Sequence, residues 1–137
     1  MASGMAHILV VEDNPVVRMV TELHLESAGY TVMTASNGQE ALELASVLRP
    51  DLILSDLDMP GMDGFGLLSA IRAREDLAAV PVIFLTMHHD MEMFHRSTML
   101  GADDYVNKPI NRIVLLNSIS KCLASAGVAA SRTIKED

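Results

Sequence analysis

Acidic, hydroxyl and amino side chains stand directly after apolar runs of this sequence. In chain order they are Glu12, Asp13, Asp56, Thr86 and Lys108. Carboxylate oxygens bind hard cations, whereas a hydroxyl and an ammonium can stabilise the negative charge on a phosphoryl group. The set therefore predicts metal-assisted phosphoryl chemistry, provided that the fold brings these distant segments together.

Three carboxylates held close together need positive charge beside them. Two carboxylates about 4 Å apart repel each other by roughly 4 kcal/mol at an effective dielectric of 20. Lys108 supplies one positive charge, and Mg²⁺ would supply two more, with two or three carboxylates and a carbonyl sufficing as its ligands. Asp56 is then the predicted nucleophile that forms an acyl phosphate, with Thr86 and Lys108 beside the transferred group.

Five apolar runs alternate with amphipathic segments and are predicted to be strands. They cover residues 7–11, 31–35, 51–54, 82–85 and 104–106. The first, third and fourth runs are apolar at nearly every position, which is typical of parallel strands covered on both faces. The second is more polar and suits an edge of the sheet.

The first two helices have recognisable ends. Asn14 followed by Pro15 predicts an N-cap, and Gly29 predicts the end of that helix. The residues expected on its buried face are Val16, Val20 and Leu23. Ser36 and Gln39 resemble a capping box for the second helix, which should end before Arg49 and Pro50. Its expected inward residues are Ala41, Ala45 and Leu48.

Three more helices complete the pattern. They are predicted over about 65–74, over about 90–100 with Gly101 closing the helix, and from about Ile110 onward. The last should bury Leu115, Ile119 and Cys122. Five strands alternating with five helices predict an α/β fold, a flavodoxin-like doubly wound parallel sheet in the order 2-1-3-4-5. Ligands of such sheets bind at the carboxyl ends of the strands, where the acidic residues are expected.

The chain resembles the receiver domains of response regulators, the CheY-like family of two-component signal transduction. The resemblance covers residues 6–124. It rests on ILVVEDN at 8–14, DLILSDLDMPGMDG at 51–64, Thr86, and ADDYVNKP at 102–109. Any one of these stretches alone is a weak signal, but their combined order and spacing is specific.

The resemblance implies a role for each site residue. Asp56 would accept a phosphoryl group from a phosphohistidine of a histidine kinase or histidine phosphotransfer protein. Mg²⁺ would be held by Glu12, Asp13, Asp56 and the backbone carbonyl of Asp58, and Lys108 would pair with the phosphoryl group. Only self-phosphorylation from a donor and slow autodephosphorylation are expected, so the domain would be a signalling module rather than an enzyme.

A switch pair follows from the same resemblance. Thr86 and Tyr105 match residues that move on phosphorylation and reshape the surface of helix four, strand five and helix five. That surface would bind a downstream protein effector, and a phosphorylation-dependent homodimer would fit as well. The bond between Lys108 and Pro109 is expected to be cis.

The sequence departs from the commonest family pattern near the switch. Met87 follows the threonine where a small residue is usual, which would narrow access to the phosphoryl group. His88 and Asp58 occupy positions that modulate the phosphate lifetime in the family. As potential metal ligands, His88, His89 and His95 form no good set, so solvated histidines are expected. Met87, Met91, Met93 and Met99 are divided between core packing and an adaptable partner surface.

Composition limits the class of protein. The chain has 137 residues, which suits one domain, and a formal net charge of −8 without a basic stripe, which argues against direct binding of nucleic acid. Cys122 is the single cysteine, so no intramolecular disulfide can form. With no signal peptide or membrane-length apolar run, a cytoplasmic protein is expected. Residues 1–5 would be a disordered N-terminus or expression scar, 6–124 the receiver domain, and 125–137 a frayed tail.

Other functions remain open at this point. Asp56 and Asp58 superficially match the nucleophile motif of haloacid dehalogenase-like phosphohydrolases, although that family places its nucleophile on the first strand and its additional acids later. A receiver-like scaffold that binds partners without phosphate would normally lack one of the site residues. If the chain is a receiver, a stand-alone regulator is preferred, and the alternative is a receiver excised from a larger hybrid kinase or regulator.

Overall fold

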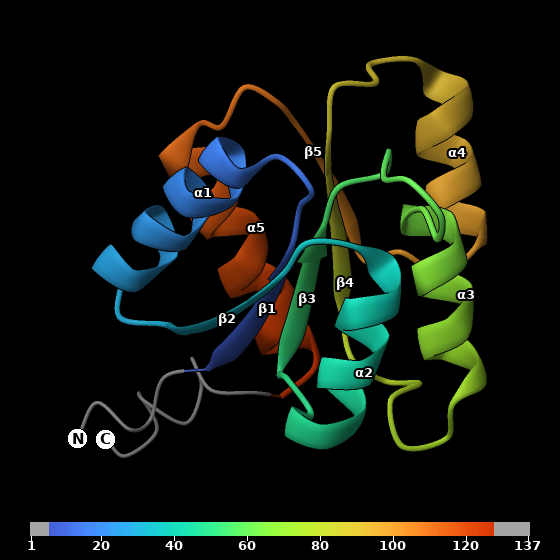
Figure 1. The fold of residues 1–137 in the computed structure, drawn as a ribbon. Helices are drawn as coiled ribbons and strands as arrows, with labels where there is room; N and C mark the ends of the chain where they lie inside the picture. Colours follow the sequence, from blue (N-terminus) through green and yellow to red (C-terminus); the bar gives the residue numbers. More distant parts are fainter. Residues whose placement is uncertain (1–5, 128–137) are drawn as a thin grey trace.

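A five-stranded parallel sheet runs through the computed structural model, which describes residues 6–127 (Figure 1). The strands are β1 (His7–Val11), β2 (Thr31–Ala35), β3 (Leu52–Ser55), β4 (Val82–Thr86) and β5 (Asp104–Asn107). Their order is β2-β1-β3-β4-β5, with every neighbouring pair parallel. The predicted fold class and strand order are confirmed, and the predicted strand ends differ by one residue at most.

Helices cover both faces of this sheet. They are α1 (Pro15–Ser27), α2 (Gly38–Leu48), α3 (Gly64–Ala73), α4 (Met91–Met99) and α5 (Arg112–Ser125). Helices α1 and α5 lie on one face, while α2, α3 and α4 lie on the other (Figure 1). No helix within residues 6–127 is both long enough and apolar enough to cross a membrane. The expected N-terminal segment 1–5 and most of the expected tail lie outside the described residues, and Ser125 still belongs to α5.

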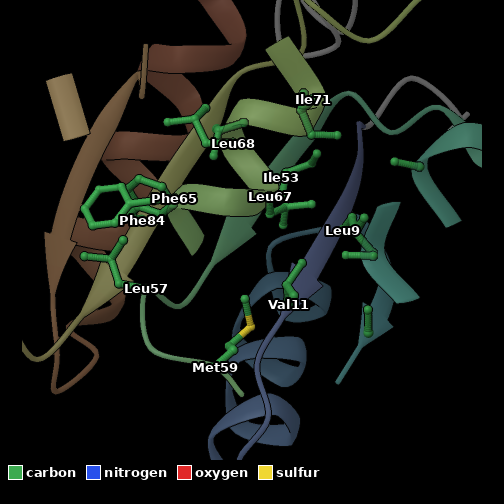
Figure 2. Close-up of a cluster of buried hydrophobic side chains, with 14 of the residues drawn as sticks. Leu9, Val11, Ile53, Leu57, Met59, Phe65, Leu67, Leu68, Ile71 and Phe84 are labelled. Atoms are coloured by element: carbon green, nitrogen blue, oxygen red, sulfur yellow. The ribbon is translucent and has the colours of Figure 1, made fainter. Parts of the chain in front are cut away.

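Two buried clusters form the core, one on each face of the sheet. Neighbouring residues of a strand point to opposite faces, so Leu9 and Val11 enter one cluster while Ile8 and Val10 enter the other. Figure 2 shows the first of these clusters, in which the rings of Phe65 and Phe84 meet edge to face with their centroids 5.6 Å apart. The two-sided burial explains why the central strands are apolar at nearly every position.

The predicted cap of α1 is confirmed, but its predicted buried face is wrong. The side-chain oxygen of Asn14 accepts hydrogen bonds from the amides of the first turn. The expected inward residues are exposed: Val16 by 63%, Val20 by 37% and Leu23 by 58%. Thr21 and Leu25 are buried instead. The Thr21 hydroxyl donates to the Val17 carbonyl at 2.7 Å, which satisfies it within the helix and lets a polar residue face the sheet.

The predicted start of α2 is displaced by one residue. Asn37, not Ser36, is the N-cap, and its Oδ1 accepts from the Glu40 amide at 2.8 Å. The Glu40 carboxylate reaches back to the Ser36 amide at 2.8 Å, so Gln39 does not complete the capping box. Leu48 is 49% exposed rather than inward; it is the last residue of the helix and is followed by the left-handed Arg49.

The remaining helices agree with their predictions to within two residues. Asp63, Asp90 and Asn111 are the N-caps of α3, α4 and α5. The expected inward residues of α5 are buried: Leu115, Ile119 and Cys122. The Lys108–Pro109 peptide bond is cis, as predicted.

Candidate functional site

Three carboxylates meet where β1 and β3 end. Val11 and Ser55 are register partners, so the chain leaves both strands at the same edge of the sheet. The Asp56 amide donates to the Val11 carbonyl at 3.0 Å, which holds the two exits together. Carboxylate oxygens of Glu12, Asp13 and Asp56 lie within 4.8 Å of one another. The predicted acidic cluster is therefore assembled from residues separated by more than forty positions.

Burial differs among the three acids. Glu12 is 4% exposed and Asp56 is 8% exposed, whereas Asp13 faces solvent. Two of the negative charges are thus largely removed from water, and the third lies at the opening of the pocket. A buried charged group needs hydrogen bonds or opposite charge nearby.

Lys108 supplies opposite charge from the far side of the pocket. Its Nζ lies 2.8 Å from Glu12 Oε1 and 3.6 Å from Asp56 Oδ1. The Lys108 amide donates to the Thr86 carbonyl at 2.7 Å, so the end of the β4–β5 ladder determines where the side chain begins. One ammonium faces three carboxylates, which leaves the pocket negatively charged.

The pKa of Asp56 reflects both its burial and the neighbouring negative charge. Burial, together with the charge on Glu12, raises the pKa of the Asp56 carboxyl from 3.8 to about 6. Lys108 and the backbone amides of Asp58 and Leu57 act in the opposite direction but do not offset burial. A pocket of oxygen donors with surplus negative charge fits a hard divalent cation such as Mg²⁺.

The loop after Asp56 is held close by a glycine. A Cβ on Gly64 would lie 2.6 Å from the Asp56 carbonyl oxygen and 2.9 Å from Leu57 Cα, so a larger residue cannot pack there without movement. The Gly64 amide donates to the Leu57 carbonyl at 2.9 Å, which closes the loop onto the end of β3. Asp58 points its side chain outward from this loop and leaves it 68% exposed.

Thr86 and Tyr105 lie on neighbouring strands, as predicted. Thr86 is fully buried, and its Oγ1 accepts a hydrogen bond from the His88 amide at 3.0 Å. The Tyr105 hydroxyl donates to the His88 carbonyl at 3.1 Å, and its ring meets the Phe94 ring edge to face at 5.6 Å. The two residues of the predicted switch pair are therefore connected through the backbone of His88.

The contacts of His88 with Asp58 and with β5 were not predicted from the sequence. His88 was expected to be a solvated histidine, but its Nε2 lies 2.8 Å from Asp58 Oδ2. Its carbonyl also accepts from Asn107 Nδ2 at 2.8 Å, in addition to Tyr105. The two partners of the ring contact are thirty positions apart, and no local pattern indicates that they meet.

Arg18 is a second residue that sequence reasoning missed. Its Nη1 donates to the Glu12 carbonyl at 2.8 Å from one turn into α1. The Asn14 amide donates to Glu12 Oε2 at 3.2 Å. Together these bonds orient Glu12 at both its backbone and its side chain.

The methionines are divided between the two predicted roles. Met93 packs against a buried cluster, whereas Met87, Met91 and Met99 are exposed by 64%, 74% and 72%. Met87 lies with Lys108 and Pro109 at one apolar recess beside α1.

A family model described as "Response regulator receiver domain" matches residues 8–120. The DNA-binding transcriptional regulator NtrC of Escherichia coli is 41% identical over 104 residues, which are 76% of this chain and 22% of NtrC. The transcriptional regulatory protein CseB of Streptomyces avermitilis is 40% identical over 124 residues, 90% of this chain and 52% of CseB. The matched region thus spans about a fifth to a half of these relatives.

Solved structures agree with the sequence relatives. The chemotaxis protein CheY4 of Vibrio cholerae superimposes with a TM-score of 0.82 at 35% identity, over 86% of this chain and 98% of that one. The receiver domain of a signal transduction histidine kinase from Syntrophus aciditrophicus gives 0.81 at 39% identity, over 88% and 91% of the two chains. These matches, together with the position of Asp56 directly after the third strand, do not support the phosphohydrolase alternative.

Proposed function

The chain belongs to the response regulator receiver domain family, and we propose that it accepts a phosphoryl group on Asp56 from a phosphohistidine. The donor would be a histidine kinase or a histidine phosphotransfer protein. One observation carries this proposal: the buried Asp56 carboxylate lies at the end of β3 with two further carboxylates and the ammonium of Lys108 around it. Within the family these are the features expected of a phosphoryl acceptor.

The transfer step uses Asp56 as the nucleophile. One of its carboxylate oxygens forms a bond to phosphorus while the phosphorus–nitrogen bond of the donor breaks, and the donor nitrogen keeps the electron pair. Lys108 stabilises the charge on the phosphoryl oxygens, since its Nζ already lies 3.6 Å from Asp56 Oδ1. Water later attacks the acyl phosphate, which returns the carboxylate and releases inorganic phosphate.

Mg²⁺ is the cofactor that the acidic pocket fits. Glu12, Asp13, Asp56 and the backbone carbonyl of Asp58 would hold it, and a bound ion would supply positive charge that offsets both the carboxylates and the incoming phosphoryl group. The ion would then offset part of the negative charge of Glu12 that Lys108 compensates in its absence. The excess negative charge of the pocket and its set of oxygen donors support this assignment.

Thr86 and Tyr105 are proposed to report phosphorylation to the surface. Thr86 would turn its hydroxyl toward the phosphoryl group, and Tyr105 would respond through their shared contact at His88. The surface formed by α4, β5 and α5 would then bind a downstream protein effector. Partly or largely exposed Phe94 and Met91 on α4 give that surface apolar side chains for such a contact.

A phosphorylation assay tests the proposal. Incubation with Mg²⁺ and acetyl phosphate should add one base-labile phosphoryl group to the wild type, detected by intact mass, and none to Asp56→Asn. Asp51→Asn is the matched control, because Asp51 lies before β3 and bonds the His7 amide away from the pocket. Modification of Asp56→Asn, or steady turnover of a phosphate monoester by the wild type, would contradict the proposal.

A further inference from the structure

His88 contacts three segments, namely the loop after Asp56, the end of β4, and β5. Its ring reaches Asp58 on the loop after β3, with Nε2 2.8 Å from Oδ2. Its amide donates to Thr86 Oγ1 at the end of β4. Its carbonyl accepts from Tyr105 and Asn107 on the edge strand β5. The side chain of His88 therefore contacts one segment, and its backbone contacts the other two.

The ring contact has a defined direction. A carboxylate only accepts hydrogen bonds, so Nε2 of His88 carries the hydrogen that it donates to Asp58. The imidazole is partly buried, with 35% of its side chain exposed, while the Asp58 side chain is 68% exposed. Solvent can therefore replace this bond at small cost, which makes it a connection that can open and close.

The backbone carbonyl of His88 also connects this residue to β5. Tyr105 Oη and Asn107 Nδ2 both donate to the single His88 oxygen, at 3.1 Å and 2.8 Å. A displacement of this carbonyl changes both bonds at once. Because β5 forms an edge of the sheet, no strand within residues 6–127 pairs with its other side to resist such a change.

We propose that His88 is a positioning residue that couples the acceptor loop, residues 57–63, to β5 through its ring contact with Asp58. The inference rests on the proposed function of Asp56, which precedes this loop directly. When a group on Asp56 shifts the loop, the ring transmits the shift to the His88 carbonyl, and from there to Tyr105 and Asn107. This connection acts in addition to the one through the Thr86 hydroxyl, which bonds the His88 amide.

Energetic coupling between the acceptor site and β5 should be measurable from either end. If loading of the acceptor site changes the strength of the bonds at β5, then the two are energetically coupled, and removal of those bonds should change the affinity of the site. Loss of the Tyr105 hydroxyl in Tyr105→Phe should therefore alter the affinity for a phosphoryl mimic. The alteration should shrink when the ring contact of His88 is absent.

Tyrosine fluorescence provides a direct readout. The chain has two tyrosines and no tryptophan, so a Tyr30→Phe background leaves Tyr105 as the reporter. Beryllofluoride with Mg²⁺ serves as the phosphoryl mimic, and fluorine NMR detects its binding independently of tyrosine. The wild-type background should bind the mimic and change its Tyr105 emission.

Four single substitutions and one double variant separate the ring contact from other effects. His88→Asn is too short to reach Asp58 and should lose most of the emission change while still binding the mimic. His88→Gln places an amide donor near the position of Nε2 and should restore the change. His89→Asn, at the exposed neighbouring position, should behave as the parent. Asp58→Ala should match His88→Asn, and the double variant should lose no more than either alone.

The following outcomes would contradict the coupling role of His88 or the proposed function. A full emission change in His88→Asn, or none in His88→Gln, would overturn the coupling role, as would a parent protein that binds the mimic without any change at Tyr105. A parent protein that neither binds beryllofluoride nor accepts a phosphoryl group would overturn the proposed function, and the coupling with it.

Discussion

Lys108 lies nearer to Glu12 than to Asp56, with its Nζ 2.8 Å from Glu12 Oε1 and 3.6 Å from Asp56 Oδ1. One ammonium is thus shared between two buried carboxylates, and Asp13 adds a third negative charge at the opening. Burial of an uncompensated charge is unfavourable, so the assembled acidic pocket lowers the free energy of unfolding of the domain. The stability of the domain and its affinity for a cation therefore depend on the same few side chains.

Asp13→Ala should weaken Mg²⁺ binding strongly while leaving the fold intact. The variant loses a metal-binding carboxylate but also relieves repulsion within the pocket, so we expect unchanged or slightly higher stability in the absence of metal. Isothermal titration with Mg²⁺ and urea unfolding measure the two effects. Glu43→Ala removes an equal charge from an exposed position of α2 and serves as the control. Wild-type Mg²⁺ affinity in Asp13→Ala would show that the metal assignment is wrong.

Asp56 should make the metal-free domain less stable as the pH rises. The folded-state pKa, about 6, lies above the ordinary value of 3.8, so the folded state holds this proton more tightly. The stability contributed by protonation is present below about pH 4 and is lost as the pH rises through 6. Asp56→Asn should therefore be more stable than the wild type at pH 7.5, by on the order of 2 kcal/mol.

Urea unfolding with a chelator present measures this difference. At pH 4.5 the gap between Asp56→Asn and the wild type should be clearly smaller, because the wild-type carboxyl is then largely protonated in the folded state. Addition of Mg²⁺ at pH 7.5 should stabilise the wild type more than the variant. An equal gap at both pH values would contradict the assigned origin of the shift.

Lys108→Met should destabilise the metal-free domain at neutral pH. It removes the ammonium from Glu12 and Asp56, which are 4% and 8% exposed, and leaves both charges without a counter-charge. Loss of one partner of a buried ion pair typically lowers the free energy of unfolding by about 3–5 kcal/mol. We expect a smaller loss of about 2–3 kcal/mol here, because the pocket opens to solvent. Lys121→Met is the control: its side chain is 68% exposed and its pair with Asp104 spans 3.5 Å. It should change the free energy of unfolding by less than about 1 kcal/mol.

Gly64→Ala should displace the acceptor loop. The added Cβ would lie 2.6 Å from the Asp56 carbonyl oxygen, and backbone atoms cannot move aside as a flexible side chain can. We expect a loss of about 2–3 kcal/mol in stability and slower phosphorylation.

Gly61→Ala separates this contact from backbone strain. Gly61 has a φ of +76°, but a Cβ added there would meet nothing within 4 Å, so alanine should cost only about 1 kcal/mol. Thermal unfolding and the rate of acetyl phosphate labelling compare the two variants. Equal effects of both substitutions would mean that the close contact at Gly64 is unimportant.

The order of strands and helices could be predicted because it depends on local properties. Apolar runs such as 7–11 and 82–85 are compatible with two covered faces of a parallel sheet, and Asn14 before Pro15 is a cap that needs no tertiary partner. The residue that follows each strand lies at the same edge of the sheet, so the convergence of Glu12, Asp56 and Lys108 follows once the strand order is known.

Tertiary packing alone decided several contacts around the site. Helix α1 carries apolar residues on more than one side, and its rotation against the sheet buried Thr21 and Leu25 while exposing Val16, Val20 and Leu23. The contact between His88 and Asp58 depends on the separation of two loops and on two rotamers. Propensity and spacing describe a residue relative to its own segment, whereas these contacts depend on the distance and rotation between segments, which only the packed core determines.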